Sequence, residues 1–261
     1  MTSHSFNCFG IRVDGLAADE ILRRADEPLA SRRPYWIVTA NPEILLYARS
    51  HAAYRDAING ADARIVDGFG LQLAGLIRGR RLRRTTGVDL AERLVDRAAE
   101  RGETVAFVGG GTGIASQALE RQRERHRNLK GYAFEGCSVN EAGEGDAKSE
   151  EMRHQVSIIG PDTLLVAFGP PKQEMWIARY LHEFPSVRVI MGVGGTFDYW
   201  AGTVPRAPRW TRALGLEWLY RLVREPRRIK RIWNAVIVFP ILSIGSLFSR
   251  RGDALRRPEQ D

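Results

Sequence analysis

Short apolar runs rich in Val, Ile and aromatic residues alternate with longer segments of helical periodicity along most of this chain. This alternation is typical of parallel strands joined by crossover helices, because parallel neighbours need a connection of a dozen or more residues. We therefore expect an α/β fold with a mostly parallel sheet and flanking helices. The expected strands are 6–13, 35–39, 63–66, 104–108, 131–134, 163–167 and 187–191. The expected helices are 17–31, 41–58, 71–78, 87–101, 114–127 and one that ends at 181, and 140–151 is expected to be an exposed loop.

The positive charge of the chain is concentrated at its C-terminal end. Residues 205–261 hold 13 Arg and Lys against 5 Asp and Glu, which accounts for the whole net charge of +8. Residues 1–204 are neutral by difference. We therefore expect two parts, an α/β body (1–204) and a basic appendage (205–261).

An uncharged apolar run, 232–249, follows the basic segment directly. Pro240 and Gly245 interrupt it, so an element lying in the membrane interface is favoured over a spanning helix. Arg221 and Arg224 recur at helical spacing in the basic segment, so they share a helical face that could meet anionic lipid. The predicted partner is therefore a membrane surface and not nucleic acid, and the alternative is a core helix with solvated charges.

The N-terminus lacks the features of a secretory signal, since no cationic stretch precedes an apolar one. The two cysteines, Cys8 and Cys137, form no CxxC pair and no metal-ligand spacing, which fits a reducing compartment. We expect a protein at the cytoplasmic face of the cell membrane, peripheral or monotopic.

A glycine-rich turn follows the strand expected at 104–108. Gly109 and Gly111 match the first two glycines of a dinucleotide-binding GxGxxG motif, whereas Ile114 stands in place of the third. Glu135, which ends the next strand, could bind a ribose hydroxyl. Two interpretations stay open, a phosphate-binding turn that includes Gly110 and a plain tight turn between strand and helix.

Three polar residues stand where two neighbouring strands end. Asp67 fits a general base, and it fits equally well a cap for the helix after it. Thr39 and Asn41 share this ambiguity, because TANPE is also a good helix-capping sequence. Carboxyl ends of parallel strands form the ligand-binding edge of such sheets, so Asp67 and Thr39 are both expected to face it.

Cations rather than a metal ion are expected to neutralise any diphosphate. The chain has no Asp-x-Asp pair of the kind that holds a divalent ion in many nucleotide-sugar enzymes. The candidates are Lys172, at the start of a helix after the Gly169-Pro170-Pro171 turn, and Arg84, Arg206 and Arg209.

Several of these segments together resemble the WecG/TagA/CpsF family of bacterial glycosyltransferases. The resemblance runs from about residue 11 to 233 and rests on TANPE (39–43), VDGFG (66–70), RTTGVDL (84–90), FVGGGTG (107–113), FGPPKQE (168–174), GVGGTFDYWAGTVPRAPRW (192–210) and GLEWLYRLVREPRR (215–228). It implies a Rossmann-like fold with a helical C-terminal appendage that contacts membrane.

The resemblance also implies an activity. This is the inverting, metal-independent transfer of a hexose or N-acetylhexosamine from a UDP-sugar to a polyprenyl-diphosphate-linked saccharide, in cell-surface polysaccharide synthesis, without a cofactor. Asp67 is then the catalytic base, with Thr39 and Asn41 in its pocket. By the same resemblance, Gln173 and Asp198 would bind donor or acceptor, and Gly194 would belong to the sugar-nucleotide pocket. The appendage arginines, Arg221 and Arg224 among them, would meet diphosphate or lipid.

The residues leave two rival classes open. One is an NAD-binding oxidoreductase that uses the Gly109–Gly113 turn, and the other is a non-enzymatic membrane adaptor built on the basic tail. They also leave the sugar open among glucose, N-acetylmannosamine and its uronic acid.

Overall fold

The computed structural model describes residues 5–27, 33–208, 211, 219–220, 229 and 233–245. Within them the strands are β1 (Ser5–Cys8), β2 (Ile11–Asp14), β3 (Tyr35–Ala40), β4 (Ala63–Val66), β5 (Thr104–Gly109), β6 (Lys130–Phe134), β7 (Thr163–Ala167) and β8 (Val189–Gly192). The helices are α1 (Ala18–Asp26), α2 (Pro42–Ser50), α3 (Ala52–Asn59), α4 (Phe69–Ile77), α5 (Gly87–Arg101), α6 (Ile114–Arg125), α7 (Ala147–Ile159), α8 (Lys172–Tyr180) and α9 (Thr196–Ala201). A 3-10 turn, η1 (Leu181–Glu183), follows α8, and a π-helical turn, η3 (Asn234–Val238), lies inside the helical residues 233–245.

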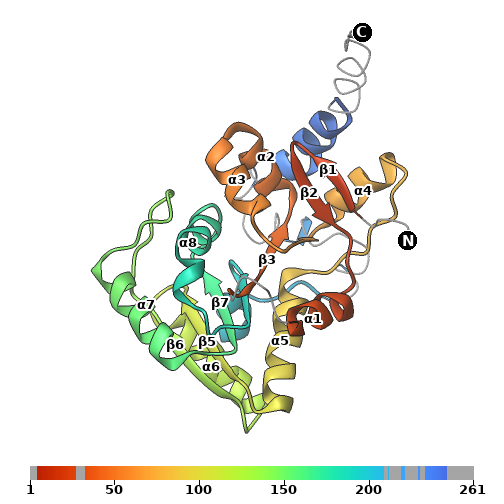
Figure 1. Ribbon diagram of the computed structural model, residues 1–261. Helices are drawn as coiled ribbons and strands as arrows, with labels where there is room; N and C mark the ends of the chain where they lie inside the picture. Colours follow the sequence, from red (N-terminus) through yellow and green to blue (C-terminus); the bar gives the residue numbers. More distant parts are fainter. Residues whose placement is uncertain are drawn as a thin grey trace.

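The strands form one eight-stranded sheet in the order β1-β2-β4-β3-β8-β7-β5-β6 (Figure 1). Every neighbouring pair is parallel except β1 and β2, which are antiparallel. The predicted α/β fold with a mostly parallel sheet is therefore confirmed.

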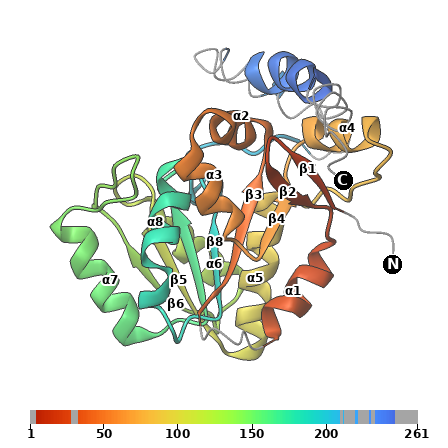
Figure 2. The same ribbon diagram turned by 45° about the horizontal axis from the view of Figure 1, so that its top comes forward.

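Helices cover both faces of the sheet (Figure 2). The core on one face contains buried residues of α2, α3, α7 and α8, and the core on the other face contains those of α1, α5, α6 and α9. In β3 the side chains alternate between the two cores, with Trp36 in one and Ile37 in the other. Because both faces are covered, the strand is apolar at nearly every position, which is why it stands out in the sequence.

The strand expected at 6–13 is two strands. Phe9 and Gly10 both have positive φ, at 53° and 80°, and they turn β1 back on β2 as a hairpin. Turns with two positive φ values match the twist of paired strands, so a two-residue reversal is stable here. The prediction was wrong because a Phe in this conformation carries no sequence signal.

The helix expected at 41–58 is broken at His51, whose backbone is extended. In α2 the buried residues include Ile44 and Ala48, and continuing that spacing would bury Ala52 and Arg55. In α3 the buried residues are instead Tyr54 and Ile58. The break at His51 therefore shifts the helical phase so that both halves bury an apolar face.

The loop expected at 140–151 is shorter than predicted, because α7 begins at Ala147. The Asp146 carboxylate accepts a hydrogen bond from the Ser149 N–H at 2.9 Å, which caps the helix. The prediction missed this helix start because residues 140–151 are rich in Gly, Glu and Ala, which favoured a loop.

The helix at 233–245 packs on the body beside α2 and the β1–β2 turn (Figure 2). Phe239 is fully buried and meets the Phe9 ring edge to face at 6.0 Å, and the Arg78 guanidinium donates to the hydroxyl and carbonyl oxygens of Ser243. No helix in the described part of the chain has the length and apolar character needed to cross a membrane. The division at residue 205 stays a prediction.

Candidate functional site

The sheet has a topological switch point between β5 and β7. The chain leaves β5 through α6 to reach β6 on one side, and it leaves β7 through α8 to reach β8 on the other. The loops after these adjacent strands therefore part and leave a crevice at the carboxyl edge of the sheet. In open α/β sheets, ligands bind in such crevices.

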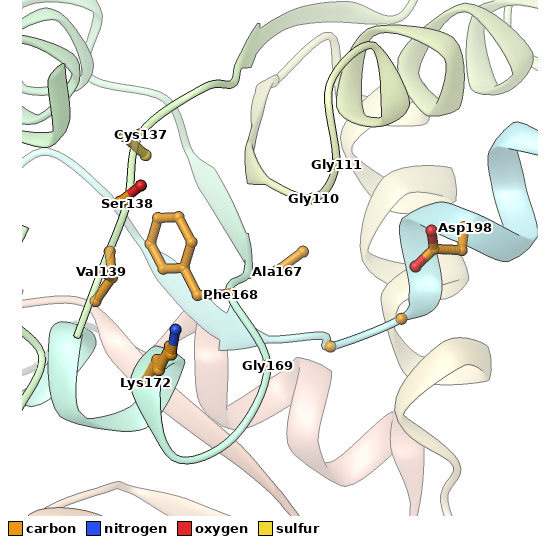
Figure 3. A pocket seen from close by; sticks show the side chains of 12 residues that line it. Gly110, Gly111, Cys137, Ser138, Val139, Ala167, Phe168, Gly169, Lys172 and Asp198 are labelled. Carbon is orange, nitrogen blue, oxygen red and sulfur yellow. The ribbon is translucent and has the colours of Figure 1, made fainter. Parts of the chain in front are cut away.

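A cavity of about 420 Å³ lies at this switch point (Figure 3). Its walls come from the loops after four strands: Gly110 and Gly111 after β5, Cys137–Val139 after β6, Ala167–Gly169 with Lys172 after β7, and Gly194, Gly195 and Asp198 after β8. Five residues expected to bind substrate, Gly110, Gly111, Lys172, Gly194 and Asp198, thus line one cavity. Their segments lie far apart in the sequence, so only the strand order brings them together.

The sequence prediction missed the wall after β6. Cys137, Ser138 and Val139 lie in the loop that begins after Phe134 at the end of β6, and so stand at the same edge as the predicted residues. The rule that places ligands at strand ends was the signal that could have found them.

The cavity carries opposite charges on its two walls. Figure 3 shows the Lys172 side chain on one wall and the Asp198 carboxylate on the other. Lys172 is the first residue of α8, so its ammonium lies near the positive end of a helix dipole. This wall is suited to an anionic group such as a diphosphate, whereas Asp198 can accept hydrogen bonds from hydroxyls or amides.

Gly109 is not among the cavity residues, because its role is close packing. A Cβ built there would lie 2.8 Å from the Phe168 ring, and its φ is +89°. A side chain at 109 would therefore displace Phe168, which does line the cavity.

The start of α6 is occupied by a side chain of the protein itself. The Glu135 carboxylate accepts hydrogen bonds from the N–H groups of Gly113 and Ser116, the latter at 2.6 Å. A dinucleotide bound to the glycine-rich turn would place its pyrophosphate at this helix N-terminus. Glu135 thus caps the helix in the place where the oxidoreductase interpretation puts a ligand.

Gln173 is buried beneath the cavity and does not line it. It is 1% exposed, and its amide oxygen accepts hydrogen bonds from Gly169 N–H at 3.2 Å and Gly194 N–H at 3.0 Å. Its amide nitrogen donates to Glu174 Oε1 at 2.7 Å. Direct binding of substrate by Gln173 stays a prediction.

Asp67 and Thr39 lie at the same edge of the sheet, where β4 and β3 end. The Asp67 carboxylate accepts a hydrogen bond from Gly87 N–H, the first residue of α5, at 3.3 Å. A Cβ at Gly87 would lie 2.9 Å from Thr39 Cγ2 and 3.4 Å from Asp67 Oδ2, so only glycine lets the helix approach so closely. The N–H groups at the start of α5 carry the positive end of the helix dipole, which attracts a negatively charged group.

The residue at the N-cap position of α4 is Gly68, which makes no side-chain cap hydrogen bond. Asn41, in contrast, does cap α2, because its Oδ1 accepts from Ile44 N–H at 3.0 Å. Capping therefore describes Asn41, whereas the role of Asp67 stays a prediction.

The predicted arginines fall in different places. Arg84 precedes Thr85, whose N–H bonds to the Val66 carbonyl at 3.1 Å, so its loop returns to the end of β4 beside Asp67. Arg206 forms ion pairs with Asp89 and Glu92 of α5 and is not a cavity residue. Arg209, Arg221 and Arg224 lie outside the described residues.

Across the described segments, no three His, Cys, Asp or Glu side chains gather as metal ligands. The expectation of metal-independent chemistry stays a prediction.

Comparison with known proteins gives consistent matches. The family model described as "Glycosyl transferase WecG/TagA/CpsF family" matches residues 6–253. A Bacillus spizizenii protein is 35% identical over 199 residues, which cover 76% of this chain and 74% of that protein. A Staphylococcus aureus (strain MRSA252) protein is 32% identical over 198 residues, covering 76% and 75%. Both relatives are named N-acetylglucosaminyldiphosphoundecaprenol N-acetyl-beta-D-mannosaminyltransferase.

Proposed function

Because the chain belongs to the WecG/TagA/CpsF family of glycosyltransferases, we propose that it transfers N-acetylmannosamine from a UDP-sugar to N-acetylglucosamine on undecaprenyl diphosphate. The names of the relatives carry the choice of sugar and acceptor, at 32–35% identity over three quarters of the chain. The product would be a lipid-linked disaccharide for synthesis of a cell-surface or cell-wall polymer.

One observation supports a donor site above all others: the cavity at the switch point is lined by five residues predicted from the sequence to bind substrate. Glycines on three of its loops let backbone N–H groups approach a diphosphate closely. Lys172 supplies a cation where negative charge develops on the departing UDP, and such preorganised charge stabilises the transition state.

The acceptor hydroxyl needs a base, and we assign this role to Asp67. Its carboxylate lies at the carboxyl edge of the same sheet and is held in place by Gly87 N–H, which leaves it an acceptor with a fixed position. Removing the hydroxyl proton as the oxygen attacks the anomeric carbon gives a single displacement with inversion. Thr39, packed against the start of α5, belongs to the same pocket.

We place the protein at the cytoplasmic membrane face because its acceptor is a lipid. The 233–245 helix turns one face to the body through Phe239 and exposes Trp233, Ile237 and Ile241 on the other, at 59%, 39% and 63%. Exposed apolar groups at helical spacing beside basic residues fit an interfacial membrane contact. Exchanging Trp233 and Ile241 for Ser is expected to reduce sedimentation with anionic vesicles, and unchanged sedimentation would contradict this placement.

The central experiment is a donor screen with purified protein, a lipid-linked N-acetylglucosamine acceptor and EDTA throughout. UDP-N-acetylmannosamine is expected to give a disaccharide product, whereas UDP-glucose and UDP-N-acetylglucosamine give at least tenfold less. Product from another donor alone would refute the assigned sugar. Absence of any product in EDTA, with product restored by Mg²⁺, would refute metal independence.

A further inference from the structure

A chain of three buried polar side chains lies directly beneath the donor cavity. Tyr54 in α3, Glu174 in α8 and Gln173 in α8 are each 1–2% exposed. The Tyr54 hydroxyl donates to Glu174 Oε2 at 3.0 Å, and Gln173 Nε2 donates to Glu174 Oε1 at 2.7 Å. Burying such groups is unfavourable unless each is paired, so the three stabilise one another only in this arrangement.

The outer end of this chain holds two loops of the cavity. Gln173 Oε1 accepts from the N–H groups of Gly169 and Gly194 at 3.2 and 3.0 Å. Both glycines line the cavity, one after β7 and the other after β8. Their φ values are +73° and +52°, so both turns have the left-handed backbone that few other residues adopt. One side-chain oxygen therefore bridges two turns that otherwise belong to separate loops.

The amide of Gln173 can serve this purpose in only one orientation. Both glycine N–H groups are donors, so the amide must turn its oxygen to them and its NH₂ group to Glu174. A reversed amide would set donors against donors and leave buried groups unpaired, which is unfavourable. An acceptor at position 174 selects the correct orientation, and Tyr54 holds that acceptor still.

The packing leaves little room for another arrangement. A Cβ built on Gly192, the last residue of β8, would lie 2.8 Å from Gln173 Nε2. The end of the strand is therefore pressed against the amide, and β8 continues directly into the Gly194 turn. A change in the amide would be transmitted to that turn.

We propose that Glu174 and Tyr54 are positioning residues for the donor cavity: they orient the Gln173 amide, whose oxygen holds the Gly169 and Gly194 turns at the spacing that a nucleoside diphosphate requires. The identity of the ligand rests on the proposed function. The bridging of the two turns does not, so the two ideas can fail separately.

The test combines hydrogen exchange by NMR with UDP binding. In Glu174→Leu the amide protons of Gly169 and Gly194 are expected to exchange at least tenfold faster, and the Kd for UDP to rise about tenfold. Glu174→Gln keeps an acceptor for Gln173 and is expected to restore both properties to within twofold. Tyr54→Phe removes only the hydroxyl and is expected to shift both in the same direction by a smaller factor, which covers the case that Glu174→Leu fails to fold.

The matched control is Ile177→Ala, on the same face of α8 and fully buried, but with an apolar side chain that forms no hydrogen bond to the amide. The cavity that this change leaves is expected to lower global stability. The Tyr35 amide, which donates to the Arg188 carbonyl at the first residue of β3, reports that loss. For each variant, the exchange rates of the Gly169 and Gly194 amide protons are divided by the exchange rate of the Tyr35 amide proton. The proposal is overturned if these ratios rise no more in Glu174→Leu than in Ile177→Ala. If the glycine amides respond selectively while even the wild-type protein fails to bind UDP, the positioning role stands and the assigned donor is wrong.

Discussion

Glu174 makes the stability of this protein depend on pH near neutrality. Burial raises the pKa of its carboxyl from the ordinary 4.5 to about 7, against hydrogen bonds from Gln173 and Tyr54 that favour the ionised form. Glu43, at the start of α2, adds a further negative charge nearby. The folded protein therefore keeps a proton on Glu174 in a pH range where the unfolded chain has lost it.

The sign follows from proton linkage. Between pH 4.5 and 7 the folded state binds more protons than the unfolded state, so the free energy of unfolding falls as the pH rises. This contribution is fully present below pH 4.5 and is lost as the pH passes through 7. At about 1.4 kcal/mol for each pH unit between the two pKa values, the total is about 3 kcal/mol.

Urea unfolding of the wild type and Glu174→Gln at half-unit steps from pH 5 to 8.5 measures this effect. The substitution adds a constant offset, but it removes the titration, so the difference between the two curves isolates Glu174. Between pH 5 and 8.5, the difference in the free energy of unfolding between the two proteins is expected to change by nearly the whole of this amount, about 3 kcal/mol. At an m-value of roughly 3 kcal/mol/M, this corresponds to about 1 M in the urea midpoint. Parallel curves across this range would refute the argument that the carboxyl is buried and protonated.

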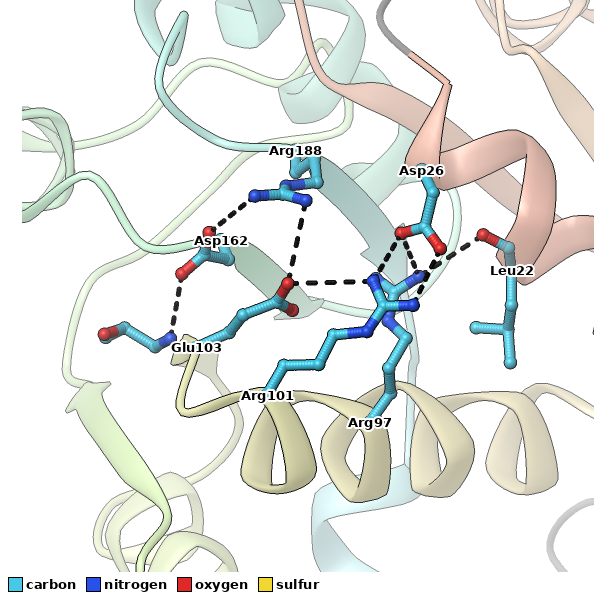
Figure 4. A network of polar contacts seen from close by, with 8 residues as sticks. Leu22, Asp26, Arg97, Arg101, Glu103, Asp162 and Arg188 are labelled. Atoms are coloured by element: carbon cyan, nitrogen blue, oxygen red, sulfur yellow. Dashed lines mark hydrogen bonds and ion pairs between the residues drawn. The ribbon is translucent and has the colours of Figure 1, made fainter.

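Three further predictions address the site and its scaffold. Asp67→Asn is expected to lower kcat roughly 10²–10⁴-fold while the Kd for UDP changes less than twofold, measured by product formation and calorimetry. Burial raises the pKa of the Cys137 thiol, so its alkylation is expected to be slow at pH 7 and faster at pH 9, and UDP should protect it because the residue lines the cavity. Asp26 binds Arg97 at 2.9 Å and Arg101 at 2.9 and 3.0 Å, so Asp26→Asn, which leaves the Arg97 charge buried, is expected to cost about 2 kcal/mol in urea unfolding (Figure 4).

Each of these has a control and a contrary result. The control for Asp67→Asn is Asp96→Asn. Asp96 lies in the C-terminal half of α5 and pairs with His126, so this change should leave kcat intact. Full activity of Asp67→Asn would remove Asp67 from the mechanism. Cys8 is 1% exposed and should not react, so the label reports on Cys137. If UDP does not slow the labelling of Cys137, the cavity is not the donor site. Glu124→Gln breaks only an exposed pair with Arg121, and a cost equal to that of Asp26→Asn would show that the network in Figure 4 is not special.

Local signals carried much of the fold. The bounds of β4, α5 and β7 agree with the sequence prediction, because each is marked by nearby residues: apolar runs for the strands, and for α5 a Thr86 cap at one end and Gly102 with positive φ at the other. Where such markers were weak, at the Phe9 turn and at His51, the prediction failed. At His51 the structure depends on tertiary packing, because the break turns the apolar side of α3 toward the core.

The site divides in the same way. The sequence alone indicated which kinds of residue stand at strand ends, because glycine turns, Lys172 and Asp67 follow apolar runs directly. It did not indicate that β8 lies between β3 and β7, since pairing of parallel strands depends on contacts between distant segments. That order brings Gly194 to Gly169 and makes Gln173 a buried bridge between them. The chemistry of the side chains is thus local, whereas their convergence on one cavity is a property of the assembled sheet.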